Sequence, residues 1–300
     1  MLANKEVLLL GLSPDAHLRF HTTTDSSPRL GAFRTQETVV DLSLMGWHEV
    51  AGLFEGQAQE AIQSAWEAPE AVTHALKDIT LLAPVDHQEV WAAGVTYLRS
   101  KTARMEESDF SASAYDRVYE APRPEIFFKS LPQKVVAPGD AVGIRKDAHW
   151  NVPEPELALV MNASGAIVGV TIGNDMSSRD IEGENLLYLP QAKTYDRSCS
   201  LGPWMVLGVD ETTVRNWTIG VHIFRNEQSV FSGETSISQI KRSFDDLAGY
   251  LFRSQCFPHG AVLMTGTGVV PNDDFTLEEG DRVDIHVSGI GTLSNSVVRV

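Results

Sequence analysis

The chain has 300 residues, of which 43% are hydrophobic, enough for a sizeable core in one large domain or in a small and a large one. Its formal net charge is −16 and it has no basic tract, so we expect neither nucleic acid nor an anionic membrane surface as a partner. Its two cysteines, Cys199 and Cys256, lie far apart and favour a reducing compartment, so we expect a cytoplasmic protein.

Residues 1–83 are expected to form a small N-terminal α/β domain. Short strands are predicted at 6–12, 16–22 and 38–43, separated by turn residues such as those at 25–31. Residues 47–68 have helical character that is interrupted near Gly56. Pro84 marks the predicted junction with the rest of the chain.

Residues 84–300 are dominated by strand signals. Helical segments are predicted only at 98–109 and 240–255, and short strands lie at 90–97, 125–130, 141–146, 156–162, 167–175, 202–208, 218–226, 228–234, 261–268 and 282–300. Many short strands with Gly and Asn turns predict an α+β fold that is mostly β.

A pair of carboxylates, Glu154 and Glu156, opens the strand predicted at 156–162. Side chains alternate along a strand, so both glutamates share one face with Ala158 and Val160. At about 3.3 Å per residue they lie roughly 7 Å apart. In a buried pocket they would repel, and one would take up a proton unless a cation lay between them. The alternative is a solvated strand entrance.

A third carboxylate, Asp175, ends the next apolar strand, at 167–175. Carboxylates at the ends of neighbouring strands can converge, and three oxygen donors suit a hard cation such as Mg²⁺, Mn²⁺ or Ca²⁺. Because no cluster of His or Cys competes, the pattern disfavours zinc. The sequence therefore predicts a cage for a divalent cation.

Several motifs together resemble the fumarylacetoacetate hydrolase superfamily. They are the Glu-x-Glu pair, the stretch GNDMSSRD at 173–180, a following lysine and Gly-Pro-Trp at 202–204, within a likeness that runs from about 91 to 297. The resemblance implies a β-rich catalytic fold and a homodimer or homotetramer. It also implies a divalent metal, with Mg²⁺ favoured, on three ligands: Glu154, Glu156 and Asp175.

The chain departs from the family's hydrolases at one position. Those hydrolases have a G-x-N-Y-x-x-H segment whose His activates water, whereas this chain reads GVTYLRS, with Ser100 in the place of the His. A narrower likeness, over 177–204, is to the branch that dehydrates 2-keto-3-deoxy sugar acids such as the D-arabinonate. That branch implies Glu125 and Lys193 as catalytic residues.

Dehydration is also consistent with elementary chemistry. A 2-keto acid chelates a metal through its carboxylate and keto oxygens, which makes the C3 protons more acidic. A base takes a C3 proton while an acid helps the C4 hydroxyl to leave, and a pentonate then yields 2,5-dioxopentanoate. We assign the base to Glu125 and the acid to Lys193, with the reverse assignment open. Alone, each would be read as an ordinary surface charge.

Four further residues are expected to meet the substrate or to surround those that do. They are Arg99, Glu182, Glu184 and Thr267, the last in a Thr-Gly-Thr-Gly stretch whose glycines let backbone N–H groups approach a carboxylate. A tight turn is the alternative for Thr267. Arg179 and Asp180 are interpreted as an internal ion pair rather than as catalytic groups.

Competing functions remain open at this point. An acylpyruvate hydrolase or a 2-keto acid decarboxylase could use the same metal, although the serine at position 100 speaks against the hydrolase. Lys193 could instead dehydrate the substrate through a Schiff base without a metal. A non-enzymatic module that binds a metal is the remaining alternative.

Overall fold

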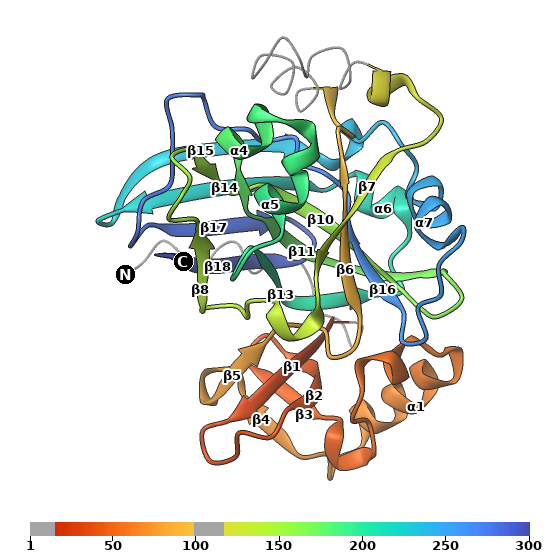
Figure 1. The fold of residues 1–300 in the computed structure, drawn as a ribbon. Coiled ribbons are helices and arrows are strands. Elements are labelled where there is room, and N and C mark those ends of the chain that lie inside the picture. The colour runs from red at the N-terminus through yellow and green to blue at the C-terminus, as the bar shows by residue number, and fades with distance from the viewer. Residues whose placement is uncertain (1–15, 99–116) are drawn as a thin grey trace.

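The computed structural model describes residues 16–98 and 117–300, and it is mostly β as predicted. An eleven-stranded sheet runs in the order β4-β3-β2-β1-β13-β11-β10-β16-β6-β7, with β5 paired to β1, and a five-stranded sheet runs β15-β14-β17-β18-β8 (Figure 1). Strands β9 and β12 form a separate pair. Within the described residues, no helix is long and apolar enough to cross a membrane.

The strands of the larger sheet come from the whole length of the chain. Their bounds are β1 (Ala16–Thr22), β2 (Arg29–Thr35), β3 (Thr38–Asp41), β4 (Thr73–Ala75), β5 (Ile79–Leu82), β6 (Glu89–Gly94), β7 (Glu125–Ser130), β10 (Pro155–Met161), β11 (Ile167–Asp175), β13 (Cys199–Leu207) and β16 (Ala261–Met264). The others are β8 (Ala141–Ile144), β9 (Asn151–Val152), β12 (Ser177–Ser178), β14 (Thr218–Arg225), β15 (Gln228–Ser236), β17 (Arg282–Val287) and β18 (Gly291–Arg299).

The helices are short. The described α-helices are α1 (Gly56–Glu67), α4 (Arg179–Glu184), α5 (Leu189–Lys193), α6 (Glu211–Arg215) and α7 (Phe244–Phe252), and residues 117–120 are also helical. Single 3-10 turns occur at η1 (Ser43–Met45), η2 (Val50–Phe54), η3 (Leu76–Asp78), η4 (Pro132–Lys134), η5 (Leu186–Tyr188) and η6 (Ile237–Gln239). The helix predicted at 240–255 is α7, whereas the segment predicted at 98–109 lies almost wholly outside the described residues.

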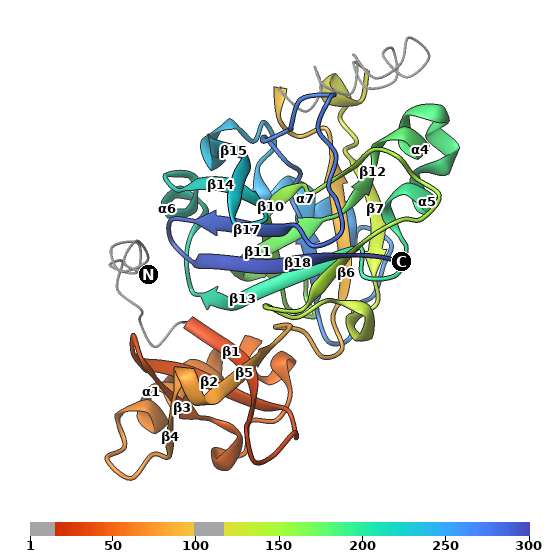
Figure 2. The same ribbon diagram turned by 90° about the vertical axis from the view of Figure 1, so that its left-hand side faces the viewer.

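The first strands and α1 form a lobe below the rest of the molecule (Figures 1 and 2). Strand β1 joins this lobe to the larger sheet through its pairing with β13, Ala16 opposite Val206 and His17 opposite Met205. The helix of the lobe begins at Gly56, where the sequence predicted an interruption, and follows η2. The strand predicted at 6–12 lies outside the described residues, and the division at residue 83 stays a prediction.

One strand of this lobe was not predicted. Residues 29–31, read as part of a turn, begin β2, which pairs with both β1 and β3. Leu30 is buried there, and the Arg29 guanidinium lies 2.7 Å from Asp25 and 2.7 Å from Asp41. The pairing of β2 with both neighbouring strands and the burial of Leu30 therefore override the local turn signal of the Ser-Pro-Arg stretch.

Strand β10 lies between two apolar clusters. Leu157 and Leu159 belong to the core that includes residues of β14, β17 and β18, whereas Ala158 and Val160 belong to the cluster on the other face of the sheet. The predicted alternation of this strand is therefore confirmed. Every residue of β10 is buried, as expected of a central strand covered on both faces.

The register of the strands brings their polar ends together. Glu156 lies opposite Gly173 on β11, and the Asp175 N–H donates to the Glu154 carbonyl at 3.0 Å. On the other side of β10, the chain leaving β16 places the Gly266 N–H 2.6 Å from Glu156 Oε2. The polar groups therefore converge at one end of the larger sheet.

Candidate active site

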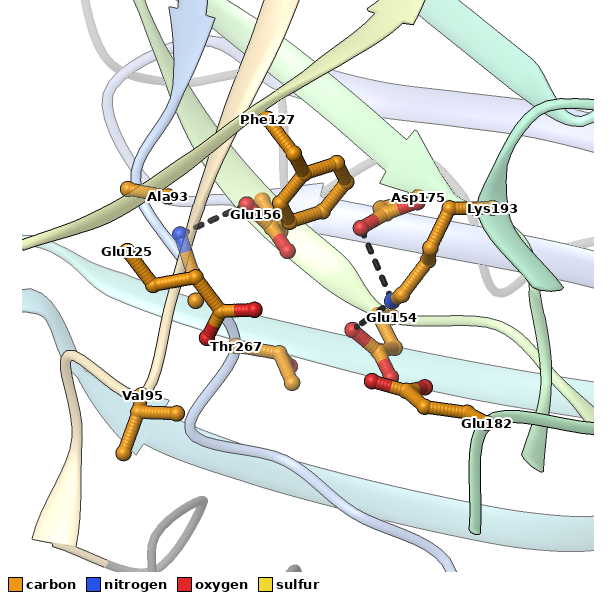
Figure 3. A pocket seen from close by; sticks show the side chains of 12 residues that line it. Ala93, Val95, Glu125, Phe127, Glu154, Glu156, Asp175, Glu182, Lys193 and Thr267 are labelled. Atoms are coloured by element: carbon orange, nitrogen blue, oxygen red, sulfur yellow. Dashed lines mark hydrogen bonds and ion pairs between the residues drawn. The ribbon is translucent and has the colours of Figure 1, made fainter. Parts of the chain in front are cut away.

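A cavity lies where these strand ends meet. Figure 3 shows the residues that line it, which come from four strands, two helices, the residue just before β10 and the loops after β6 and β16: Ala93, Gly94, Val95, Glu125, Phe127, Glu154, Glu156, Asp175, Glu182, Lys193, Gly266 and Thr267. Five acidic side chains and one lysine share this space, so the cavity has a strongly polar interior.

Three of the carboxylates form a compact group, the acidic triad of Glu154, Glu156 and Asp175. One oxygen of each lies within 4.8 Å of an oxygen of the others, and all three residues are buried. Glu154 and Glu156 reach the cavity from the start of β10, and Asp175 reaches it from the end of β11. The predicted convergence of the three carboxylates is thus observed in the structure.

Three buried cationic side chains surround the triad. Lys193 Nζ lies 2.8 Å from Glu154 Oε2 and 2.9 Å from Asp175 Oδ2, and it donates to both. Arg179 Nη2 lies 3.1 Å from Glu154 Oε1. Lys129 Nζ contacts Asp175 Oδ1 closely, as an ion pair rather than a well-aligned hydrogen bond. Glu154 and Asp175 are therefore each held by two cations.

Glu156 has a different environment. Its closest donor is the neutral backbone N–H of Gly266. Burial raises the pKa of Glu156 well above its usual range, and the nearby charges of Asp175 and Glu154 raise it further, while Lys193 partly opposes them. A hard divalent cation would relieve this repulsion, and three buried carboxylates with oxygens close together are the donors that Mg²⁺, Mn²⁺ and Ca²⁺ prefer. The donor set therefore fits such a cation.

The remaining predicted residues divide into three groups. Glu125, Glu182 and Thr267 line the cavity with the triad and Lys193. Glu184 is exposed and lies outside the set of lining residues, so its predicted contact with substrate has no support from the geometry. Arg99, like Ser100, lies outside the described residues.

Sequence reasoning missed a second contribution from strand β7. Glu125, Phe127 and Lys129 are alternate residues and share one face. Phe127 lines the cavity, with the centre of its ring 5.8 Å from Lys193 Nζ, and Lys129 contacts Asp175 beside the cavity. Alternation from Glu125 was the signal that could have identified both. Arg179, interpreted as a partner of Asp180, pairs with Glu154.

Glycine at position 94 leaves room for Glu125. Gly94 on β6 is directly opposite Glu125 on β7, and a Cβ at position 94 would collide with the Glu125 carboxylate. The placement of this carboxylate therefore depends on the absence of a side chain on the neighbouring strand.

The fold and this site define the class of protein. The family described as "Fumarylacetoacetate (FAA) hydrolase C-terminal" matches residues 89–298, more than two thirds of the chain. The chain therefore belongs to the fumarylacetoacetate hydrolase family, as its motifs predicted.

Three of the proteins similar to this chain are sugar-acid dehydratases by name. The chain is 50% identical over 234 residues, 78% of its length and 80% of the relative's, to a probable 2-keto-3-deoxyxylonate dehydratase of Haloferax volcanii. It is 39% identical over 225 residues, 74% of its length and 76% of the relative's, to the 2-dehydro-3-deoxy-D-arabinonate dehydratase of Saccharolobus solfataricus. A solved 2-keto-3-deoxy-D-arabinonate dehydratase, complexed with magnesium and 2,5-dioxopentanoate, superposes with a TM-score of 0.77 at 30% identity, covering 95% of this chain and 99% of its own.

The uneven pairing of the triad leads to a prediction about the metal-free protein. Glu156→Gln keeps a side-chain oxygen that can accept from the Gly266 N–H, and it removes the carboxyl group whose pKa is raised. This substitution should therefore increase the melting temperature at neutral pH. Glu154→Gln leaves Arg179 and Lys193 with one carboxylate fewer and should cost about 3–5 kcal/mol, the usual cost of breaking a buried ion pair. Thermal unfolding in EDTA measures both changes.

The pH dependence provides the control for this prediction. A carboxyl with a raised pKa favours folding while it is protonated, so the metal-free wild type should lose stability as pH rises through the pKa of folded Glu156. The Gln variant should lack that loss. Equal destabilisation by the two substitutions would contradict the proposal that Glu154 is paired with cations whereas Glu156 is not.

Proposed function

We propose that the protein is a metal-dependent hydro-lyase that dehydrates a 2-keto-3-deoxy sugar acid, with a pentonate as the favoured substrate and 2,5-dioxopentanoate as the product. The observation that carries this proposal is one cavity that contains the acidic triad, Glu125 and Lys193 together. The identity to two proteins named as dehydratases of such acids supports it.

The triad of Glu154, Glu156 and Asp175 would hold the cation. We assign Mg²⁺, the ion bound in the complex of the solved relative, with Mn²⁺ and Ca²⁺ as alternatives for the same oxygen donors. When bound, such an ion polarises the keto group of a 2-keto acid and stabilises the negative charge that develops on its oxygen. It also provides a local positive charge that attracts an acid to a protein with a net charge of −16.

Two side chains of the cavity would move the protons. Glu125 and Lys193 lie on opposite sides of Glu156 in Figure 3. We assign to Glu125 the removal of a C3 proton, because a carboxylate accepts a proton readily from a C–H made acidic by an adjacent keto group. Lys193 donates a proton to the C4 hydroxyl, which leaves as water, and a C3=C4 double bond forms.

Isomerisation completes the reaction. The C5 carbon loses a proton and C3 gains one, which moves the double bond to C4=C5 and leaves an enol at C5. Protonation at C4 and loss of the proton from the enol hydroxyl then give the C5 aldehyde. The sum is the loss of one water molecule, with no oxidant or reductant required. A hexonate would follow the same course and yield a ketone at C5 instead.

Other residues would recognise the substrate. Glu182 and Thr267 line the cavity and are assigned to its hydroxyl and carboxylate groups, and Arg99 and Glu184 are proposed to help from its surroundings.

The proposal extends to the organisation of the protein. Residues 84–300 are assigned to the catalytic domain and 1–83 to a small N-terminal domain, which is supported by the start of the family match at residue 89. A homodimer or homotetramer in the cytoplasm, acting in pentose degradation, follows from the family resemblance and the cysteine content.

The function is tested with the purified protein after treatment with EDTA and reconstitution with Mg²⁺ or Mn²⁺. We expect a panel of 2-keto-3-deoxy pentonates and hexonates to yield a dicarbonyl product only with the metal, detected by trapping the new carbonyl. Oxaloacetate and an acylpyruvate represent the decarboxylase and the hydrolase. Faster turnover of either one would contradict the assignment, and full activity of the metal-free protein would favour the Schiff base on Lys193.

The assignment of the two proton carriers is tested with Glu125→Gln and Lys193→Met. Each should lower kcat by about 10²–10⁴-fold while substrate binding remains, the usual effect of losing a positioned acid or base. Exchange of the C3 protons with deuterium from the solvent requires only the base. We therefore expect exchange to be lost in Glu125→Gln and kept in Lys193→Met, and the opposite pattern would reverse the two roles.

A glycine provides a matched pair of controls for the same prediction. Gly94→Ala keeps Glu125 but displaces its carboxylate, and a small misplacement of a catalytic group can lower the rate by about 100-fold. Gly249→Ala on α7 adds the same methyl group where no atom lies within 4 Å, so it should leave kcat unchanged. Equal activity in both variants would mean that the position of Glu125 does not matter to the reaction.

A further inference from the structure

Lys129 is a buried ammonium that the proposed reaction does not use. Its side chain is fully buried, and it is not among the residues that line the cavity. It is the third residue, after Glu125 and Phe127, on the face of β7 that contributes to the site. The role of this buried cation must therefore be sought in the groups that it contacts.

The ammonium of Lys129 makes two hydrogen bonds and one ion pair. It pairs with Asp175 Oδ1, donates to the Met176 carbonyl at 3.0 Å, and donates to the Lys193 carbonyl over a short distance. These acceptors come from the end of β11 and the end of α5. One ammonium thus connects three segments, which carry Glu125, Asp175 and Lys193.

Space filling is a poor explanation for this residue. Burial of an ammonium is unfavourable unless charge and hydrogen bonds compensate it, and a methionine would occupy a similar volume without that cost. The ion pair with Asp175 also distinguishes the two oxygens of that carboxylate. Lys129 approaches Oδ1, whereas Lys193 binds Oδ2 together with Glu154 Oε2, so the two cations fix the rotation of the Asp175 carboxylate.

We propose that Lys129 is a positioning residue, which orients Asp175 as a ligand of the cation and fixes the backbone of Lys193 at the end of α5. This inference rests on the proposed metal site. Two effects of the ammonium oppose each other, because its charge repels a cation while its contacts orient a ligand. Orientation dominates, so removal of Lys129 weakens the binding of metal.

The test is the affinity of the metal-free protein for Mn²⁺, measured by electron paramagnetic resonance without substrate. Lys129→Met should bind Mn²⁺ about 10- to 100-fold more weakly than the wild type, the usual effect of losing a group that orients a ligand. Lys134→Met, at an exposed position just after β7, removes the same charge and should leave the affinity unchanged. Unchanged or tighter binding by Lys129→Met would overturn the inference.

Two further variants separate orientation from loss of stability. Ile285→Ala creates a cavity in the core at β17, far along the chain from the triad, and should lower the melting temperature without changing the affinity for Mn²⁺. If Lys129→Met does not fold, Lys129→Arg keeps the charge but not the geometry of three separate donors. Lys129→Arg should still weaken the binding of Mn²⁺, and wild-type affinity in that variant would equally overturn the inference.

The result for the wild type distinguishes this inference from the proposed function. If the wild type binds no Mn²⁺, the metal site itself is wrong and the role of Lys129 falls with it. If the wild type and Lys129→Met bind Mn²⁺ equally, the metal site stands and only the positioning role is wrong.

Discussion

Three carboxylates buried within a few ångströms of one another need positive charge, and the surrounding side chains provide it to two of them but not equally to the third. Glu154 and Asp175 each contact two cationic side chains, whereas Glu156 has a backbone N–H as its closest donor and a raised pKa. A cluster built only for stability would pair all three, or would replace them with apolar residues. Glu156, which has no cationic side chain as its closest donor, is the carboxylate whose charge a divalent cation would compensate.

The geometry of the sheet explains how this cluster forms from separate segments. Alternation places Glu154 and Glu156 on one face of β10, and the pairing of β10 with β11 sets Asp175 beside Glu154. Alternation and strand pairing also place Glu125, because Gly94 on β6 lies opposite Glu125 on β7. The site is therefore a property of strand register, and a slip of one residue in β7 would turn Glu125 to the opposite face.

The sequence predicted most of this site, and its failures have physical causes. Strand periodicity located β7, β10 and β11 and suggested that the triad converges. The role of Lys193 came only through resemblance, because α5 reaches the cavity by way of tertiary packing that no local pattern encodes. Lys129 could have been found by alternation from Glu125, but its partners Asp175, Met176 and Lys193 come from other segments, which a local pattern does not show. The start of β2 was missed because its pairing with β1 and β3 outweighs the turn residues before it. Glu184, two residues from Glu182, is exposed because the short helix α4 turns it away.

The central claim is that the fold assembles the triad to hold the cation that the reaction needs. Diffraction from crystals of the protein grown with Mn²⁺, recorded where manganese scatters anomalously, tests it most directly. The account predicts one strong peak within coordination distance of Glu154, Glu156 and Asp175, and its loss in the Glu156→Gln variant. Crystals that contain Mn²⁺ at a concentration sufficient for activity but show no peak at the triad would contradict it.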